Sequence, residues 1–187
     1  MPYTPALAQR IFPSRHLVRE IGVVLGGVLL VAALAQVSVS AGGGVPVTGQ
    51  TLGVFLVGAW LGFRRASLAL LLYLLLGGAG LPLFAGLSGG LDHLTSESGG
   101  YLVGFVLAAG TVGLLAEHGF LESYRMAALT CAIASLPIYV IGLAWLMHFM
   151  SPAEAFYGGF LIFLPGAAIK IALATAIVGR YRRPRAP

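Results

Sequence analysis

Long apolar segments separated by short polar or glycine-rich connections dominate this 187-residue sequence. A helix that spans a membrane needs about 20 mostly apolar residues, and shorter segments are accommodated when they are buried or tilted. Six segments match this pattern, so the sequence predicts an all-α, polytopic membrane protein with six transmembrane helices. The expected segments are 21–41, 51–63, 66–80, 99–116, 124–150 and 156–180.

The second and third segments are short, and Arg64 and Arg65 stand between them. Joining the two segments would give five crossings and would bury both arginines. Six crossings instead place every arginine on one side, as the positive-inside rule requires of the cytoplasmic side. We therefore expect a cell-membrane protein with both termini in the cytoplasm. The arginines on that side are Arg10, Arg15, Arg19, Arg64, Arg65, Arg125, Arg180, Arg182, Arg183 and Arg185, and the opposite side holds Asp92, Glu97 and Glu154.

The composition supports the membrane class. Hydrophobic residues make up 58% of the chain and charged residues only 9%, with a mean hydropathy of +0.94, whereas soluble domains carry roughly 25% charged residues. We expect a single transmembrane domain over 1–187, with short basic segments at 1–19 and 180–187. The first apolar segment is too long for a signal-peptide core and lacks a small-residue cleavage site, so it is expected to be retained.

The sequence contains no motif that predicts catalysis, a metal site or a cofactor. It has no His-Glu-x-x-His, no Gly-x-Ser-x-Gly and no phosphate-binding Gly-x-x-x-x-Gly-Lys. The net charge of +5 follows from the cytoplasmic arginines and does not predict a nucleic-acid partner. If the chain takes part in active transport, we expect separate subunits to hydrolyse ATP.

Lys170 is the one basic residue expected within the membrane. It lies about 15 Å from Arg180 along a helix, near the middle of a hydrocarbon core about 30 Å thick. An ammonium group there is costly unless it meets water, a counter-charge or a ligand. The predicted membrane segments hold no Asp or Glu, so this position favours a small carboxylate ligand. Pro165 and Gly166 predict a weakened helix just above it.

Two connections, 42–50 and 82–98, are moderately apolar and unusually rich in glycine. Irregular backbone cannot face lipid, so these loops either cover a ligand or pack as ordinary loops on the helix ends. Candidate polar groups near this surface are Gln50, Ser88, Tyr101 and Tyr157.

Glycines four residues apart also recur, as in Gly58 with Gly62 and Gly100 with Gly104, and such pairs favour close helix packing. Gly22 and Gly26 have the same spacing and form either a packing face or a docking face for another subunit.

Several motifs in order resemble one family. These are Val-Pro-Val-Thr-Gly-Gln-Thr-Leu at 45–52, Gly-Leu-Pro-Leu-Phe-Ala-Gly at 80–86 with Ser-Gly-Gly at 88–90, Gly-Gly-Tyr-Leu-Val-Gly-Phe at 99–105, and Phe-Leu-Pro-Gly at 163–166 followed by Lys170. Together they resemble the BioY family, the biotin-specific S component of energy-coupling factor (ECF) transporters. The resemblance implies a six-helix bundle with an outward pocket that captures biotin. It also implies a transmembrane T component and two ATPase subunits as partners.

The resemblance also implies site residues. Gln50, Tyr101 and Lys170 match motif positions at or near the pocket, and the loop motif adds Phe84, Ser88 and Gly89 as substrate-binding candidates. Gly22 and Gly26 match the face toward the T component. The segment before Gly99 departs from the family pattern, because this chain has Glu97-Ser98 where the family usually has a sequence that resembles Pro-Thr.

One departure from the family pattern concerns the ligand. The last helix usually carries Pro-Gly-Asp-x-x-Lys, and here Ala167 replaces the acid. This substitution removes an acceptor for the ureido N–H groups of biotin. Either Glu97 or another loop group then serves as the acceptor. The alternatives are a biotin precursor or another small carboxylate vitamin as ligand, or a membrane scaffold that transports nothing.

Overall fold

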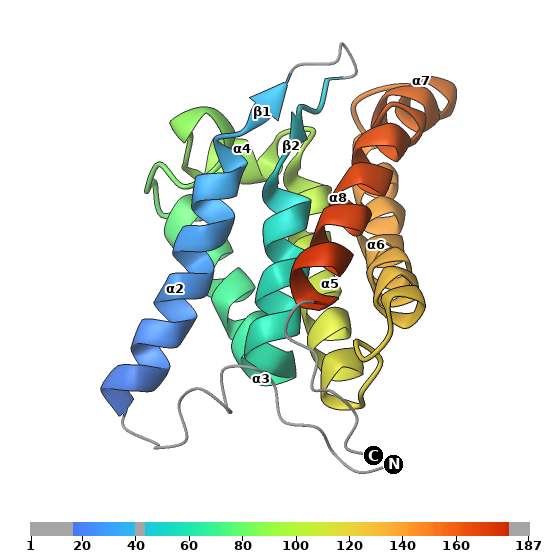
Figure 1. The fold of residues 1–187 in the computed structure, drawn as a ribbon. Coiled ribbons are helices and arrows are strands. Elements are labelled where there is room, and N and C mark those ends of the chain that lie inside the picture. The colour runs from blue at the N-terminus through green and yellow to red at the C-terminus, as the bar shows by residue number, and fades with distance from the viewer. Residues whose placement is uncertain (1–16, 40–43, 180–187) are drawn as a thin grey trace, which may run out of the picture.

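The computed structural model describes residues 17–39 and 44–179, and these form a mostly helical bundle with one short strand pair (Figure 1). The helices that are long enough to span a membrane are joined at one end by short helical turns and by the strand pair. The elements are α2 (Leu17–Ala35), β1 (Ser38–Val39), β2 (Val47–Thr48), α3 (Gln50–Gly78), a 3₁₀ turn (Ala85–Leu87), α4 (Leu91–Thr95), α5 (Gly99–Glu117), α6 (Tyr124–Leu146), α7 (Pro152–Phe156), a π-helical turn (Tyr157–Leu161) and α8 (Phe163–Gly179).

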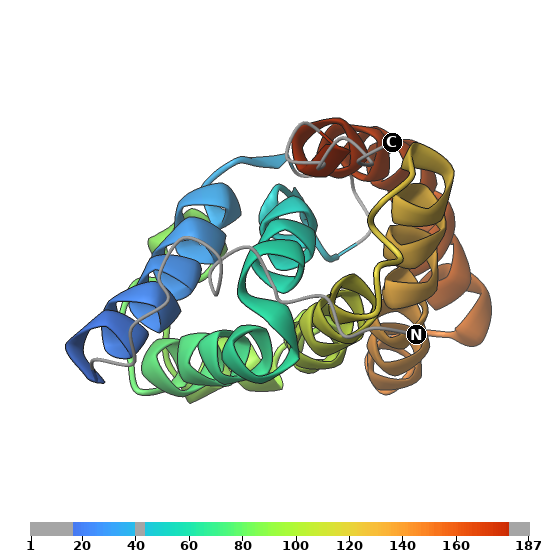
Figure 2. The ribbon, with the colours of Figure 1, turned by 60° about the horizontal axis from the view of Figure 1, so that its bottom comes forward.

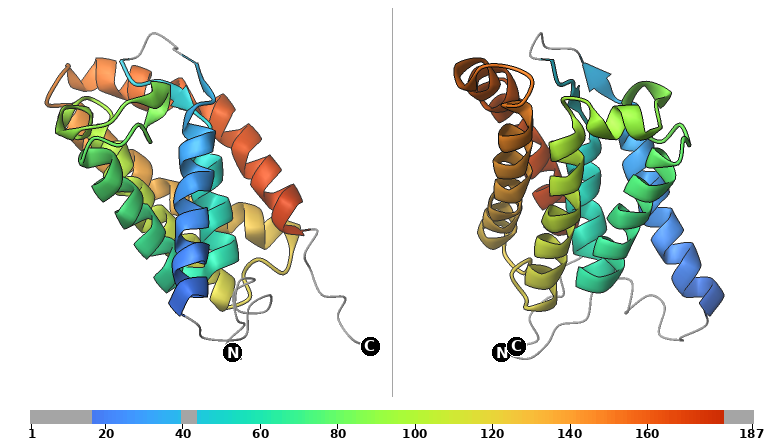
Figure 3. Two further views of the ribbon diagram at one scale, coloured as in Figure 1. Left: turned by 90° about the vertical axis from the view of Figure 1, so that its left-hand side faces the viewer. Right: turned by 180° about the vertical axis from the view of Figure 1, so that it is seen from behind.

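Helix α3 folds back on itself at Gly62, which has φ 79° and ψ 176°. The side chain of Gln50 donates a hydrogen bond of 2.7 Å to the hydroxyl of Tyr73, although 23 residues of straight helix would separate them by about 35 Å. The two limbs of α3 are therefore antiparallel, as Figures 1, 2 and 3 show. This arrangement fits six crossings and not the five that joining the segments would give.

Glycine permits this reversal because it adopts backbone angles that are closed to other residues. The second limb begins at Phe63, whose backbone N–H donates to the Glu117 carboxylate at 3.1 Å. A helix start leaves such N–H groups without an intrahelical acceptor, so Glu117 caps the new limb. The reversal lies directly beside Arg64 and Arg65.

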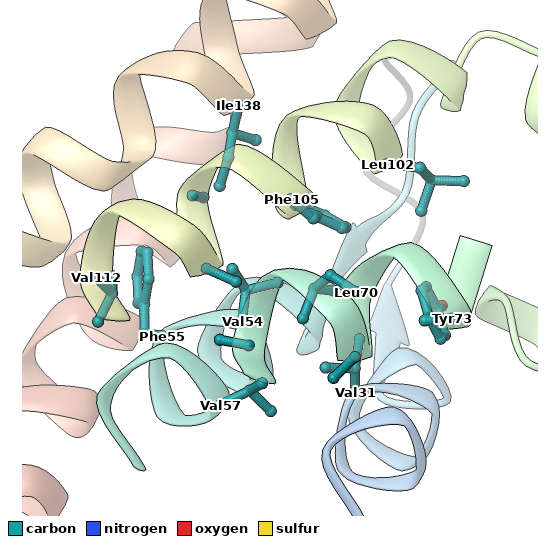
Figure 4. Close-up of a cluster of buried hydrophobic side chains, with 14 of the residues drawn as sticks. Val31, Val54, Phe55, Val57, Leu70, Tyr73, Leu102, Phe105, Val112 and Ile138 are labelled. Atoms are coloured by element: carbon teal, nitrogen blue, oxygen red, sulfur yellow. The ribbon is translucent and has the colours of Figure 1, made fainter. Parts of the chain in front are cut away.

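Close contact between helices depends on glycines. A Cβ atom on Gly104 of α5 would meet the backbone of Ile138 in α6, and one on Gly58 of α3 would meet the carbonyl of Ala109 in α5. The predicted packing role of these glycines is confirmed. Large apolar side chains from α3 and α5, among them Phe55 and Phe105, fill the space between the helices (Figure 4).

Apart from Lys170, the charges of the described residues gather at the two ends of the bundle. Arg19 in the first turn of α2 and Arg125 in the first turn of α6 lie at the end opposite α4 and α7, which carry Asp92 and Glu154 (Figure 1). Arg65 forms two hydrogen bonds of 2.6 Å with Glu20 at the basic end. Of the other arginines named above, those at 10, 15, 180, 182, 183 and 185 lie outside the described residues. The cytoplasmic location of the basic end stays a prediction.

Two predicted helices have different bounds. Helix α2 ends at Ala35 and does not reach residue 41, because the chain turns into β1, which pairs antiparallel with β2. The last predicted helix is interrupted by the π-helical turn, after which α8 begins at Phe163. Pro165 lies in the first turn of α8, so the π-helical irregularity falls directly before the position where the sequence predicts Pro165 and Gly166 to weaken the helix.

Candidate substrate cavity

A partly enclosed cavity lies beneath the connections that join the helices at the acidic end of the bundle. About 640 Å³ of empty space, including open solvent at its mouth, lies within its bounds. Most of the surface area of its wall is apolar, although nine of its lining residues carry polar side chains, which come from β2, from helices α3, α4, α5, α6 and α8, and from the residue before α5. The polar lining residues are Thr48, Gln50, Thr51, His93, Ser98, Tyr101, Ser135, Tyr139 and Lys170.

Lys170 of α8 lines this cavity and is half-buried. Its side chain has no hydrogen bond or ion pair with any residue in the described part of the chain. No Asp or Glu among the described residues lines the cavity either. A buried cation without a counter-charge is costly, so the geometry favours an anionic ligand. Ala167 lies one turn earlier on the same wall, where the BioY motif has an acid.

Gln50 belongs to a buried hydrogen-bond network. Its Oε1 accepts a bond of 2.8 Å from the Thr48 hydroxyl, and its Nε2 donates to the Tyr73 hydroxyl. Tyr73 in turn donates to the backbone carbonyl of Leu83 at 3.1 Å. The network connects the strand pair, both limbs of α3 and the loop after α3. Gln50 therefore fixes the wall of the cavity in addition to lining it.

Tyr101 also lines the cavity, but its hydroxyl already has an acceptor. It donates to the carbonyl of Gly159 at 3.0 Å, and its ring stacks on Phe163 with 5.9 Å between the centroids. Tyr101 therefore connects α5 to the π-helical turn that leads into α8. Its hydroxyl offers only lone pairs to a ligand.

Phe84, Ser88 and Gly89 lie behind the wall. Phe84 is fully buried and stacks on His93 with a centroid distance of 5.0 Å, and the Ser88 hydroxyl lies 3.0 Å from His93 Nδ1. The structure thus places these residues where they support the loop, and their direct contact with a ligand stays a prediction. Tyr157 is 64% exposed and does not line the cavity. Glu97 lies against Gly44 in the first loop and also lies outside the lining.

Sequence reasoning missed most of the neutral polar groups of the wall. Ser135 and Tyr139 lie four residues apart on α6, so helical periodicity would have placed them on one face. Thr51 stands inside a motif that the sequence singled out. His93 lies on the five-residue helix α4, and Ser98 precedes α5. Short helices and loops have no periodic pattern, so no sequence signal points to these two residues.

Replacing Tyr73 with Phe tests the network around Gln50. The change removes one hydroxyl and leaves the Gln50 amide and the Leu83 carbonyl without their partners, which costs about 1–3 kcal/mol. We expect a lower melting temperature in detergent, measured by thermal unfolding. Tyr139→Phe is the matched control, because no hydrogen bond joins the Tyr139 hydroxyl to another described residue. Equal melting temperatures for the two variants would contradict the prediction.

The fold and the cavity together define a membrane protein with the fold of an S component. The structure matches the crystal structure of the S-component for biotin from an ECF-type ABC transporter with a TM-score of 0.78, over 88% of this chain and 90% of that chain. The two sequences are 22% identical, so this likeness establishes the fold.

The sequence identifies the family. The BioY family model matches residues 6–186. A probable biotin transporter BioY of Pyrococcus horikoshii is 37% identical over 88% of this chain and 96% of its own. The biotin transporter BioY of Thermotoga maritima is 38% identical over 75% and 83% of the two chains. The chain belongs to the BioY family, as its motifs predicted.

Proposed function

We propose that this chain captures biotin at the outer face of the membrane and serves as the substrate-binding subunit of an ECF-type transporter. The observation that carries the proposal is that Lys170, which pairs with no other described residue, lines a partly enclosed cavity whose surface is mostly apolar. The names of the relatives supply the ligand. Biotin combines a carboxylate, a hydrocarbon chain and a ring with two N–H groups, and the cavity offers a complement to each part.

The charged and apolar parts of the wall complement the carboxylate and the hydrocarbon part of biotin. Lys170 pairs with the carboxylate, and a charge-assisted bond of this kind contributes about 1.5–3 kcal/mol. The apolar side chains Leu102, Phe105 and Ile138 surround the hydrocarbon part. Neutral polar groups of the wall accept the N–H groups of the ring, because Ala167 cannot.

The partners are proposed from the family. A T component and two ATPases would supply the energy for release on the cytoplasmic side, where both termini lie in this proposal. Gly22 and Gly26 are exposed on α2, and a Cβ atom added to either meets nothing within 4 Å. This open, small-residue surface suits close approach by another membrane helix. Gly26→Leu should reduce co-purification with the T component and leave biotin affinity unchanged, and a loss of both would contradict the assignment.

Equilibrium binding of labelled biotin to the purified chain tests the proposal directly. We expect saturable binding and a higher melting temperature with biotin, because a ligand that binds only the folded state stabilises it. Uptake into cells that express the chain with and without the partner subunits measures transport. An unchanged melting temperature and no uptake at excess biotin would refute the function.

A second candidate is a biotin precursor or another small carboxylate vitamin, and Ala167 favours the vitamin with fewer ring N–H groups. A cavity without an acid at this position lacks one strong acceptor for such groups, so a ligand with fewer of them loses less, whereas dethiobiotin keeps both N–H groups of the cyclic urea and is affected as biotin is. Competition of unlabelled dethiobiotin and other carboxylate vitamins against labelled biotin ranks these ligands. Tighter binding of a competitor than of biotin would identify it as the preferred substrate.

A further inference from the structure

His93 reaches the cavity from α4 in the loop that covers it, and two contacts hold its ring. One face of the imidazole stacks on Phe84 with an angle of 22° between the planes. Its Nδ1 atom lies 3.0 Å from the hydroxyl of Ser88, which stands behind the wall. The ring is therefore fixed both in its plane and in its rotation.

The hydrogen bonds of Ser88 determine which ring nitrogen of His93 carries the proton. A serine hydroxyl has one proton, and Ser88 donates it to the carbonyl of Ala85 at 2.7 Å. The contact with His93 therefore requires Nδ1–H to be the donor and Ser88 the acceptor. In the neutral ring, Nε2 then has no proton and offers a lone pair.

Three other hydroxyl groups of the wall also donate their protons to acceptors within the protein. Thr48 donates to Gln50, Tyr101 donates to Gly159, and Ser135 donates to the carbonyl of Cys131 at 2.8 Å. These hydroxyls present only lone pairs to a ligand. The cavity thus offers several neutral acceptors, together with the hydroxyls of Thr51, Ser98 and Tyr139, which donate to no other described residue. Among the described lining residues, Lys170 is the one charged group.

We infer that His93 Nε2 accepts a hydrogen bond from an N–H group of the ligand and so determines specificity in a cavity where Ala167 replaces an acid. The inference rests on the proposed function and extends it. It assigns the ligand to molecules that combine a carboxylate with a cyclic urea or amide N–H. A ligand whose polar ring carries only acceptors would leave His93 Nε2 without a donor and lose affinity.

This role makes binding sensitive to pH. Burial lowers the pKa of His93 below its usual value, so the ring is neutral in the folded protein at neutral pH. When the pH falls through this pKa, Nε2 gains a proton and can no longer accept an N–H. Because the ligand binds the neutral ring, the contribution of this hydrogen bond to affinity is full above the pKa and is lost as the pH falls through it.

Other titratable groups near His93 contribute their own pH dependence. Lys170, Tyr101 and Tyr139 line the same cavity, and Asp92 and Glu97 lie on either side of His93 along the chain. The ligand carboxylate also titrates. A variant without the imidazole keeps all of these groups, so the difference between its pH profile and that of the natural chain isolates His93.

The experiment measures the dissociation constant of biotin at pH 7.5 and pH 5.5 for the natural chain, His93→Phe and His93→Gln. Phe keeps the stacking on Phe84 and removes the acceptor, so we expect affinity at pH 7.5 to fall by about threefold to tenfold, as for one neutral hydrogen bond. Its change with pH should be smaller than that of the natural chain. Gln supplies an acceptor that does not titrate. The Gln variant should therefore retain more affinity than the Phe variant and show the same small change of affinity with pH.

A biotin analogue with methylated ring nitrogens tests the same contact from the side of the ligand. The natural chain should prefer biotin over the analogue more strongly than His93→Phe does, a comparison that does not depend on how stable the variant is. Equal preference in both chains, or an unchanged affinity and pH profile in His93→Phe, would overturn the assignment of His93 alone. A natural chain that binds no biotin would overturn the proposed function, and this inference with it.

Discussion

Lys170→Met should weaken biotin binding by about tenfold to a hundredfold, which is the loss expected for one charge-assisted hydrogen bond. Methionine keeps the length and apolar stem of the side chain and removes the charge. The unliganded variant should melt at the same temperature as the natural chain or higher, because an unpaired cation in the membrane is removed. Binding and thermal unfolding in detergent measure the two effects.

Biotin amide, in which a neutral group replaces the carboxylate, supplies the control. The natural chain should bind biotin amide much more weakly than biotin, whereas Lys170→Met should bind the two alike. The four affinities form a double-mutant cycle that isolates the lysine–carboxylate interaction. Arg64→Gln removes a cation from the opposite, basic end of the bundle and should leave both affinities unchanged. Equal biotin affinity in the natural chain and Lys170→Met would remove the basis of the proposed function.

Gly62→Ala should destabilise the fold by about 1–3 kcal/mol, the usual cost of holding a residue with a side chain in a sparsely populated region of backbone angles. Gly62 has φ 79° and ψ 176° at the reversal between the two limbs of α3. The two limbs cannot separate freely to relieve this strain, because the hydrogen bond between Gln50 and Tyr73 holds them together at their other end. Thermal unfolding in detergent, together with expression level, measures the loss.

Gly26→Ala is the matched control for this substitution. Gly26 lies within α2, and a Cβ atom there meets nothing within 4 Å. Alanine is a better helix former than glycine, so this variant should be as stable as the natural chain or slightly more stable. Similar melting temperatures for the Gly62 and Gly26 variants would show that the reversal tolerates an ordinary residue.

The cavity shows which parts of the site the sequence could predict. Lys170 was predictable because a lone charge in an apolar segment stands out by its solvation cost, and the family motifs pointed to Gln50 and Tyr101. The supporting positions of Phe84 and Ser88 were not predictable. Both lie in a loop whose path depends on contacts with distant segments, including the hydrogen bonds from Gln36 to the carbonyl of Phe84 and from Leu87 to Gln36.

The sequence by itself determined the membrane class, the number of apolar segments and the family, because hydropathy, charge and short motifs are local properties that can be evaluated from the sequence alone. Only the tertiary structure decided where α3 reverses, that the last segment contains a π-helical turn, and that His93 stands in the wall of the cavity. These features depend on residues far apart in the chain, such as Phe63 with Glu117 and Tyr101 with Gly159. A hydrogen bond between distant segments forms only when the whole bundle brings them together, and for that reason no local pattern records it.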